Sequence, residues 1–161
     1  MLSMDVDLFK LCSEKEWSEV RKYLSSDADT EEGKKFNVMH YADFMYRHYG
    51  TCLHLACRDD APAPDDIIKA MLDIGGKEFV MAVDVYDKTA LHWACYRNWS
   101  GASYNPSYNI IKMLIEVGGK DLVMAQSDYD GETALTIATR WGASNIIKEL
   151  LTVHQSTVNV T

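Results

Sequence analysis

Two segments of the sequence match each other almost residue by residue. One runs from Ile67 to Cys95 and reads IIKAMLDIGGKEFVMAVDVYDKTALHWAC, and the other runs from Ile110 to Thr139 and reads IIKMLIEVGGKDLVMAQSDYDGETALTIAT. A gap of one residue is enough to align them. Similarity of this length at this spacing indicates stacked copies of one structural unit, so a repeat array is the strongest constraint on the fold.

A shorter motif recurs three times and marks the start of each copy. Its copies begin at Thr51, Thr89 and Thr133, so the threonines are 38 and 44 residues apart. Each threonine precedes an apolar run with the spacing of one helix face, and its hydroxyl can cap that helix. A second apolar helix follows each run. Two weaker runs, Leu8–Cys12 and Glu19–Leu24, look like a degenerate first copy.

These patterns predict an all-α protein with four successive helix pairs and little or no extended sheet. First helices are expected near residues 6–12, 52–58, 90–97 and 134–141, and second helices near residues 16–25, 65–74, 107–117 and 144–153. The glycine pairs at 75–76 and 118–119 are expected to end two of the second helices, because glycine accepts left-handed backbone. Tight turns should follow at 84–88 and 128–132.

Two helices and a turn, carrying Thr-x-Leu-His-x-Ala in two copies, resemble the ankyrin repeat. The segment Asp128-Tyr129-Asp130-Gly131-Glu132-Thr133 matches the turn that opens such a repeat. The resemblance extends from about Thr51 to Val153 and implies a solenoid of about four helix-turn-helix repeats with lengthened loops. Asp87 replaces a turn glycine and Thr136 replaces the histidine, and the spacing exceeds the family's usual ~33 residues.

The resemblance divides a single domain, residues 1–161, into successive parts. These are a degenerate N-terminal capping repeat (1–26), an insertion (27–50), a second repeat (51–88), a third repeat (89–132), a C-terminal repeat (133–154) and a tail (155–161). The aromatic residues between 34 and 50 have spacings that suggest a short amphipathic helix. This helix could pack against the repeats or contact a partner.

Composition narrows the classes of function. The formal net charge is −8 and the pI is about 5.0, which disfavours nucleic acid because phosphate binding needs clustered cations. No apolar run reaches the roughly 18 residues of a membrane span, and the N-terminus lacks the pattern of a signal peptide. We therefore expect an intracellular protein, cytoplasmic or nuclear, whose four cysteines are reduced.

Cysteine and histidine residues within the repeats raise the question of a zinc site. Cys57 and Cys95 occupy equivalent repeat positions, however, which favours stacked core residues over the closely spaced ligand pairs of zinc sites. His54 and His92 stand where ankyrin-like repeats bond to neighbouring backbone. The Gly-Gly-Lys segments lack the spacing of a phosphate loop. Since no nucleophile and base recur at informative spacing, we expect no metal, no cofactor and no enzymatic activity.

The resemblance implies a protein-binding scaffold whose turn tips and first-helix ends line a concave groove. In the turns these positions are Val85, Tyr86, Lys88, Tyr129, Asp130 and Glu132, and in the helices they are Arg58, Asp59, Tyr96, Arg97, Arg140 and Trp141. Tyrosine, tryptophan and arginine are frequent interface anchors, although a solvated surface would also account for these positions. We predict a monomeric, non-enzymatic scaffold with a protein partner. The alternative is a regulatory or targeting subunit of a larger enzyme complex.

Overall fold

The structure is a computed structural model that describes residues 7–27, 30–39, 50–58, 62–96, 107–128 and 130–156, without the side chain of Phe36. Within these ranges the chain is all-α, as the sequence predicts. Extended pairing in the same ranges consists of one isolated bridge between Val83 and Thr89, in the turn before a helix.

The helices occur in pairs, and in each pair a short first helix precedes a longer second one. The first helices are α1 (Leu8–Ser13), α4 (Cys52–Cys57), α6 (Ala90–Cys95) and α8 (Ala134–Arg140). The second helices are α2 (Trp17–Ser25), α5 (Asp65–Val80), α7 (Tyr108–Met124) and α9 (Asn145–Ser156). The ends of all eight helices agree with the predicted ranges to within a few residues, except that α5 and α7 extend beyond the predicted C-terminal ends at residues 74 and 117.

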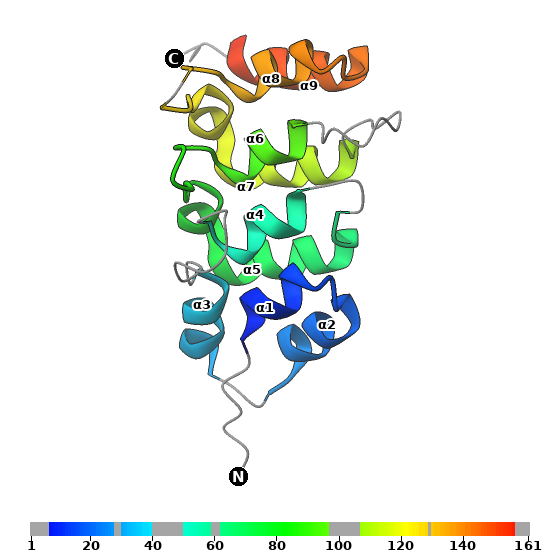
Figure 1. The fold of residues 1–161 in the computed structure, drawn as a ribbon, viewed down its shortest axis with the longest axis vertical. Helices are drawn as coiled ribbons and strands as arrows, with labels where there is room; N and C mark the ends of the chain where they lie inside the picture. The colour runs from blue at the N-terminus through cyan, green and yellow to red at the C-terminus, as the bar shows by residue number, and fades with distance from the viewer. Residues whose placement is uncertain are drawn as a thin grey trace.

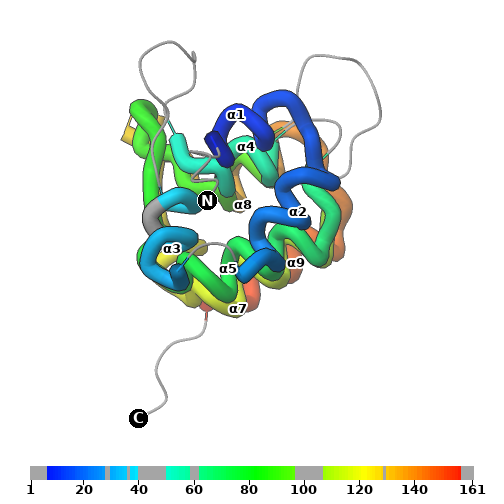
Figure 2. Tube along the Cα trace, turned by 90° about the horizontal axis from the view of Figure 1, so that it is seen from below, coloured from blue at the N-terminus to red at the C-terminus, as the bar shows by residue number. Residues whose placement is uncertain are grey.

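Figure 1 shows the pairs stacked along the long axis of the molecule from the N-terminal to the C-terminal end. The first helices form one row and the second helices form another, and successive helices within each row are in contact. Viewed along the stack in Figure 2, the two rows lie as two layers, side by side. Each pair therefore contacts mainly the pair before it and the pair after it.

Small side chains allow the first helices to stack closely. Ala56, Cys57, Ala94 and Cys95 are at most 3% exposed, and they lie on the faces that point into the stack. Larger aliphatic side chains from the second helices fill the space between the two rows. Such a distribution favours close packing, because small residues on one layer meet large ones on the other.

The glycine pairs break α5 and α7 but do not end them. Gly76 and Gly119 have φ values of 61° and 66°, in the left-handed region that glycine adopts without strain. A Cβ atom on Gly75 would lie 2.5 Å from the Phe79 side chain, which leaves no room for any other residue. The prediction of a backbone break at each glycine pair is therefore confirmed, but the prediction that the helices end there is wrong. The chain returns to helix after the break and buries Phe79 or, one repeat later, Leu122.

The stretch predicted as an insertion, residues 27–50, contains helix α3 (Glu31–Met39), which packs against α5. An ion pair between Lys35 and Glu78 joins them, as one between Lys77 and Asp121 joins α5 to α7. The order of residue types from Gly33, Gly-Lys-Lys-Phe, also resembles the Gly-Lys-Glu-Phe of α5. We interpret α3 as a counterpart of the segments that follow the glycine breaks. The remaining residues, 40–49, including most of the predicted amphipathic helix, lie outside the described ranges.

Candidate protein-binding surface

A turn precedes each of the helices α6 and α8. We name the turn before α6 finger 1 (residues 82–89) and the turn before α8 finger 2 (residues 125–128 and 130–133). A buried carboxylate shapes finger 1. One oxygen of Asp84 accepts the backbone N–H groups of Tyr86 and Lys88 at 2.8 and 2.9 Å. The other oxygen accepts the indole N–H of Trp93 at 2.7 Å. Asp84 therefore holds the turn and also ties it to α6.

Finger 2 is closed by a serine in place of the aspartate. The backbone N–H of Ser127 donates to the carbonyl of Glu132 at 3.0 Å, and its hydroxyl donates to the carboxylate of Asp130 at 2.7 Å. The N–H of Asp128 donates to the carbonyl of Tyr86 at 3.3 Å. The two fingers are thus bonded to each other and form a continuous edge along one side of the stack.

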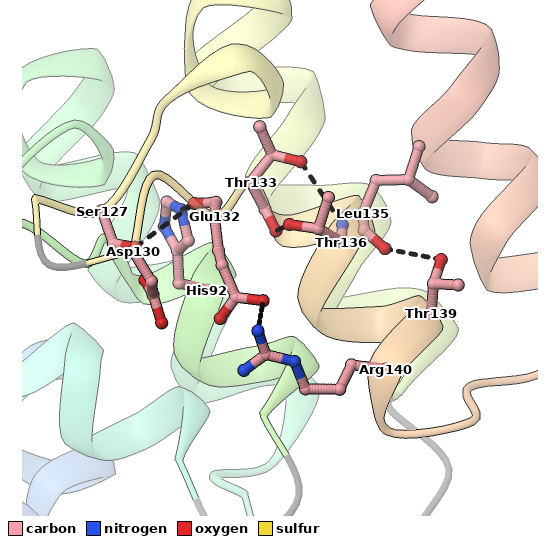
Figure 3. A network of polar contacts seen from close by, with 9 residues as sticks. All are labelled: His92, Ser127, Asp130, Glu132, Thr133, Leu135, Thr136, Thr139 and Arg140. Atoms are coloured by element: carbon pink, nitrogen blue, oxygen red, sulfur yellow. Dashed lines mark hydrogen bonds and ion pairs between the residues drawn. The ribbon is translucent and has the colours of Figure 1, made fainter.

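Buried histidines attach the first helices to the fingers. In His92, Nδ1 accepts the N–H of Thr89, and Nε2 donates to the carbonyl of Glu132 at 3.0 Å. Figure 3 shows the bond between His92 and Glu132. His54 makes the equivalent bonds one repeat earlier, and its second bond goes to the carbonyl of Lys88. Burial lowers the pKa of both rings, so both are neutral at pH 7. The fingers are therefore fixed parts of the fold.

Three aromatic rings form a stack that spans two repeats. The ring of Tyr96 lies between those of Trp93 and Trp141, with centroid distances of 5.5 and 5.3 Å and edge-to-face angles of 64° and 65°. Tyr96 follows the last residue of α6 and Trp141 follows the last residue of α8. Such pairs contribute about 0.5–1.5 kcal/mol beyond area burial. We call Trp93, Tyr96 and Trp141 the aromatic stack.

Two cations lie over the aromatic stack. The guanidinium carbon of Arg58 is 5.0 Å from the centre of the Trp93 ring. The ammonium of Lys88 is 5.8 Å from that centre and 5.4 Å from the centre of the Tyr96 ring. These distances are within the ~6 Å range of cation–π attraction. Arg58 and Lys88 thus place two positive charges against the aromatic stack, beside the Asp84 carboxylate that accepts the Trp93 indole N–H.

The structure corrects the sequence-based expectation for Glu132. Its side chain is only 10% exposed and forms an ion pair with Arg140 at the end of α8 (Figure 3). Burial, followed by the neighbouring Asp130 carboxylate, raises the pKa of Glu132. The hydrogen bond from Ser127 lowers the pKa of Asp130. Glu132 thus fastens finger 2 to α8 and does not face solvent, whereas Asp130 is exposed.

The other predicted surface residues fall into three groups. Val85 and Tyr86 are 54% and 46% exposed in finger 1, and Asp130 is exposed in finger 2. Four half-buried residues converge on Trp93 directly or through the aromatic stack: Arg58, Lys88, Tyr96 and Trp141. Three predicted residues, Asp59, Arg97 and Tyr129, lie outside the described residues.

Sequence reasoning did not identify Trp93 and Asp84, the two residues that organise this surface. Leu55 and Ile137 occupy the repeat position of Trp93 in the other copies, so a tryptophan at an otherwise aliphatic position was the available signal. For Asp84 the signal was weaker, because aspartate is common in turns of many kinds.

The four cysteines are free and buried, in agreement with the predicted burial of Cys57 and Cys95. Burial raises the pKa of both thiols, that of Cys95 to about 12, so neither forms a reactive thiolate at pH 7. The thiol of Cys52 donates to the carbonyl of Val38 at 3.1 Å. In the described part of the chain, no group of three or more His, Cys, Asp or Glu side chains is placed to hold a metal ion.

Comparison with known proteins adds no assignment. No family model matches the sequence, and no curated protein matches it at a significant level.

None of the helices in the described ranges combines the length and hydrophobicity needed to cross a bilayer.

Proposed function

We propose that this chain is a non-enzymatic scaffold of the ankyrin-repeat type that binds a protein partner through its fingers and aromatic stack. The repeat assignment is supported by the two rows of stacked helices, and by the histidine bonds from one repeat to the finger of the next. A stack of this kind offers an extended outer surface, which suits binding of another macromolecule.

The aromatic stack with its two cations is the observation on which the proposal rests. Tryptophan, tyrosine and arginine contribute most of the energy at protein interfaces. Here the rings pack against one another and the fingers are bonded to the helices, so little side-chain freedom is left to lose when a partner binds. The exposed side chains of Val85 and Tyr86 extend this surface to the tip of finger 1. The four buried free thiols support an intracellular location, cytoplasmic or nuclear.

Quantitative capture from the native source tests the proposal with two matched double variants. The surface variant combines Tyr86→Ala with Lys88→Glu, and the control combines Tyr108→Ala with Lys112→Glu on α7. Tyr86 and Tyr108 have similar exposures of 46% and 40%. Thermal melts establish that both variants fold.

We expect one or more proteins to be retained by the wild type and by the control but weakened in the surface variant. If the substituted residues are interface anchors, the loss is about thirtyfold or more, which corresponds to about 2 kcal/mol. The proposal fails if no retained protein distinguishes the two variants, or if only the control loses binding.

A further inference from the structure

Two arginine ion pairs join separate parts of the stack, and they differ in the surroundings of the carboxylate. Arg21 of α2 pairs with Asp66 of α5, and Arg140 of α8 pairs with Glu132 of finger 2. Both arginine side chains are about half exposed, at 49% and 57%. Asp66 is 58% exposed, whereas Glu132 is only 10% exposed. The two pairs therefore compare an exposed carboxylate with a buried one.

A second carboxylate lies beside Glu132 in finger 2. Figure 3 shows the side chains of Asp130 and Glu132 extending from the turn in the same direction, with Arg140 reaching Glu132 from the end of α8. Burial and the like charge of Asp130 raise the pKa of Glu132, because both disfavour its ionised form. The Ser127 hydroxyl donates to Asp130 at 2.7 Å and lowers the pKa of that carboxyl. A proton taken up by the two carboxylates therefore binds to Glu132.

The other charged and titratable groups around Glu132 come from three further elements. Lys88 of finger 1 and Arg140 of α8 both favour the ionised form of Glu132. The His92 ring of α6 donates to the backbone carbonyl of Glu132, and burial lowers the pKa of this ring. The two cations oppose the effect of burial without reversing it, so Glu132 takes up a proton more readily than an isolated carboxylate does.

The exposed pair has the opposite balance. Arg21 donates two hydrogen bonds to Asp66, from Nε at 2.6 Å and from Nη2 at 3.1 Å. These bonds lower the pKa of Asp66, whose exposed carboxylate also keeps much of its hydration. As the pH falls, the ion pair of Glu132 should therefore lose its negative charge before that of Asp66.

We propose that Asp130 and Glu132 form a proton-binding pair that holds Arg140 while both are ionised and releases it when one proton binds. The proton comes from solvent and binds a carboxylate oxygen of Glu132, so the guanidinium of Arg140 loses its negative partner. Arg140 directly precedes Trp141 of the aromatic stack. Acidification thereby makes the candidate surface more positive by one charge and removes a link between finger 2 and α8.

Proton binding by this pair is a property of the isolated chain, whereas its effect on a partner rests on the proposed function. NMR of the arginine Nε–H groups tests the release, with Arg21 as a control in the same molecule. Order parameters of both groups are followed as the pH is lowered stepwise from neutrality. We expect the order parameter of Arg140 to fall at a higher pH than that of Arg21, while the backbone signals remain those of the folded protein. Arginine stays protonated throughout, so each fall reports the loss of the carboxylate partner.

Isosteric variants assign the release to the pair. Glu132→Gln removes the charge that holds Arg140, so this arginine should already be mobile at neutral pH. Asp130→Asn keeps an acceptor oxygen but removes the like charge, so it should retain the ion pair and move the release to lower pH. The matched control, Asp66→Asn, should mobilise Arg21 and leave the titration of Arg140 unchanged.

Loss of order at the same pH in Arg140 and Arg21 would overturn the proposal, including the case in which both lose it only on unfolding. A release of Arg140 at the wild-type pH in Asp130→Asn would also overturn it, because the second carboxylate would then have no part in binding the proton. Since every readout uses the isolated chain, these failures would leave the proposed partner binding intact. Failure of the capture experiment would likewise leave the proton-binding pair intact.

Discussion

The third and fourth copies of the repeat, α6–α7 and α8–α9, have similar sequences but unequal numbers of neighbours. The third copy is packed on both sides, and its His92 ring bonds forward to finger 2. The fourth copy is packed by α6 and α7 on one side, and the hydroxyl of Thr136 turns back to its own cap. In a stack of repeats, stability comes largely from the interfaces between neighbours. Equivalent substitutions in the two copies should therefore have unequal effects.

The largest difference is expected for the leucine of the shared motif. Leu91 is fully buried, while its counterpart Leu135 is half-buried. Leu91→Ala should lower the free energy of unfolding by roughly 2–5 kcal/mol, because it leaves a cavity between two repeats. Leu135→Ala should cost about half as much or less, since part of its side chain already contacts solvent. Urea unfolding of both variants measures the difference, and equal losses would contradict the comparison.

Replacing the forward-bonding histidine tests the link between repeats. His92→Gln removes the ring that joins the buried N–H of Thr89 to the carbonyl of Glu132. Since each unpaired buried group costs about 1–3 kcal/mol, we expect a loss of at least about 2 kcal/mol. Thr136→Ala, at the same position of the fourth copy, should cost less than about 1 kcal/mol because it removes only a local hydroxyl bond. A comparable loss in both variants would argue against the inter-repeat bond.

The buried histidines also predict how stability depends on pH. Burial lowers the pKa of His54 and His92 in the folded state, while in the unfolded state each ring titrates near its ordinary value of about 6.5. Their contribution is complete above that value and is lost as the pH falls below it, because the unfolded chain then binds more protons.

Melting temperatures between pH 7 and pH 5 measure this effect. The wild type should lose stability across the window, and a variant carrying both His54→Gln and His92→Gln should show a smaller slope. Equal slopes in the two proteins would mean that these rings do not control the pH dependence.

The smallest effect concerns one turn position that the two fingers fill differently. Asp87 has a φ of 53°, and Gly131 at the equivalent position has a φ of 63°. Asp87→Gly should stabilise the protein by up to about 1 kcal/mol, because it relieves left-handed strain. Gly131→Ala should destabilise it by about 1–2 kcal/mol for the same reason. The Cβ of an alanine at position 131 would meet no atom within 4 Å, so the unfolding curves of this variant report the backbone effect alone.

The repeat pattern predicted the helices well because the same signals occur in each copy. The threonine before each first helix and the apolar spacing after it placed the starts of α4, α6 and α8 to within one residue. The paired glycines correctly marked breaks in the backbone. They could not show that the chain returns to helix and buries Phe79 and Leu122, because that burial depends on the packing of the folded chain.

The candidate surface was predictable in outline but not in detail. Their positions in the repeat identified Arg58, Lys88, Tyr96 and Trp141 as surface candidates. In the structure these four residues contact Trp93 directly or through the aromatic stack. The burial of Glu132 depends on its pairing with Arg140 at the far end of the next helix, which no local pattern encodes. Ile146 in α9 is exposed while Ile110 at the same position of α7 is buried, although both helices contain Asn-Ile-Ile-Lys, so the same local sequence does not fix burial.

The proposed binding surface is tested most directly by amide hydrogen exchange. The probe is the protein that the surface variant loses most strongly in capture, and exchange is followed with and without it. We predict slowed exchange in finger 1, in finger 2 and at the ends of α6 and α8, with little change in the outward-facing parts of α5 and α7. Slowed exchange confined to α5 and α7, with the fingers unchanged, would contradict the account.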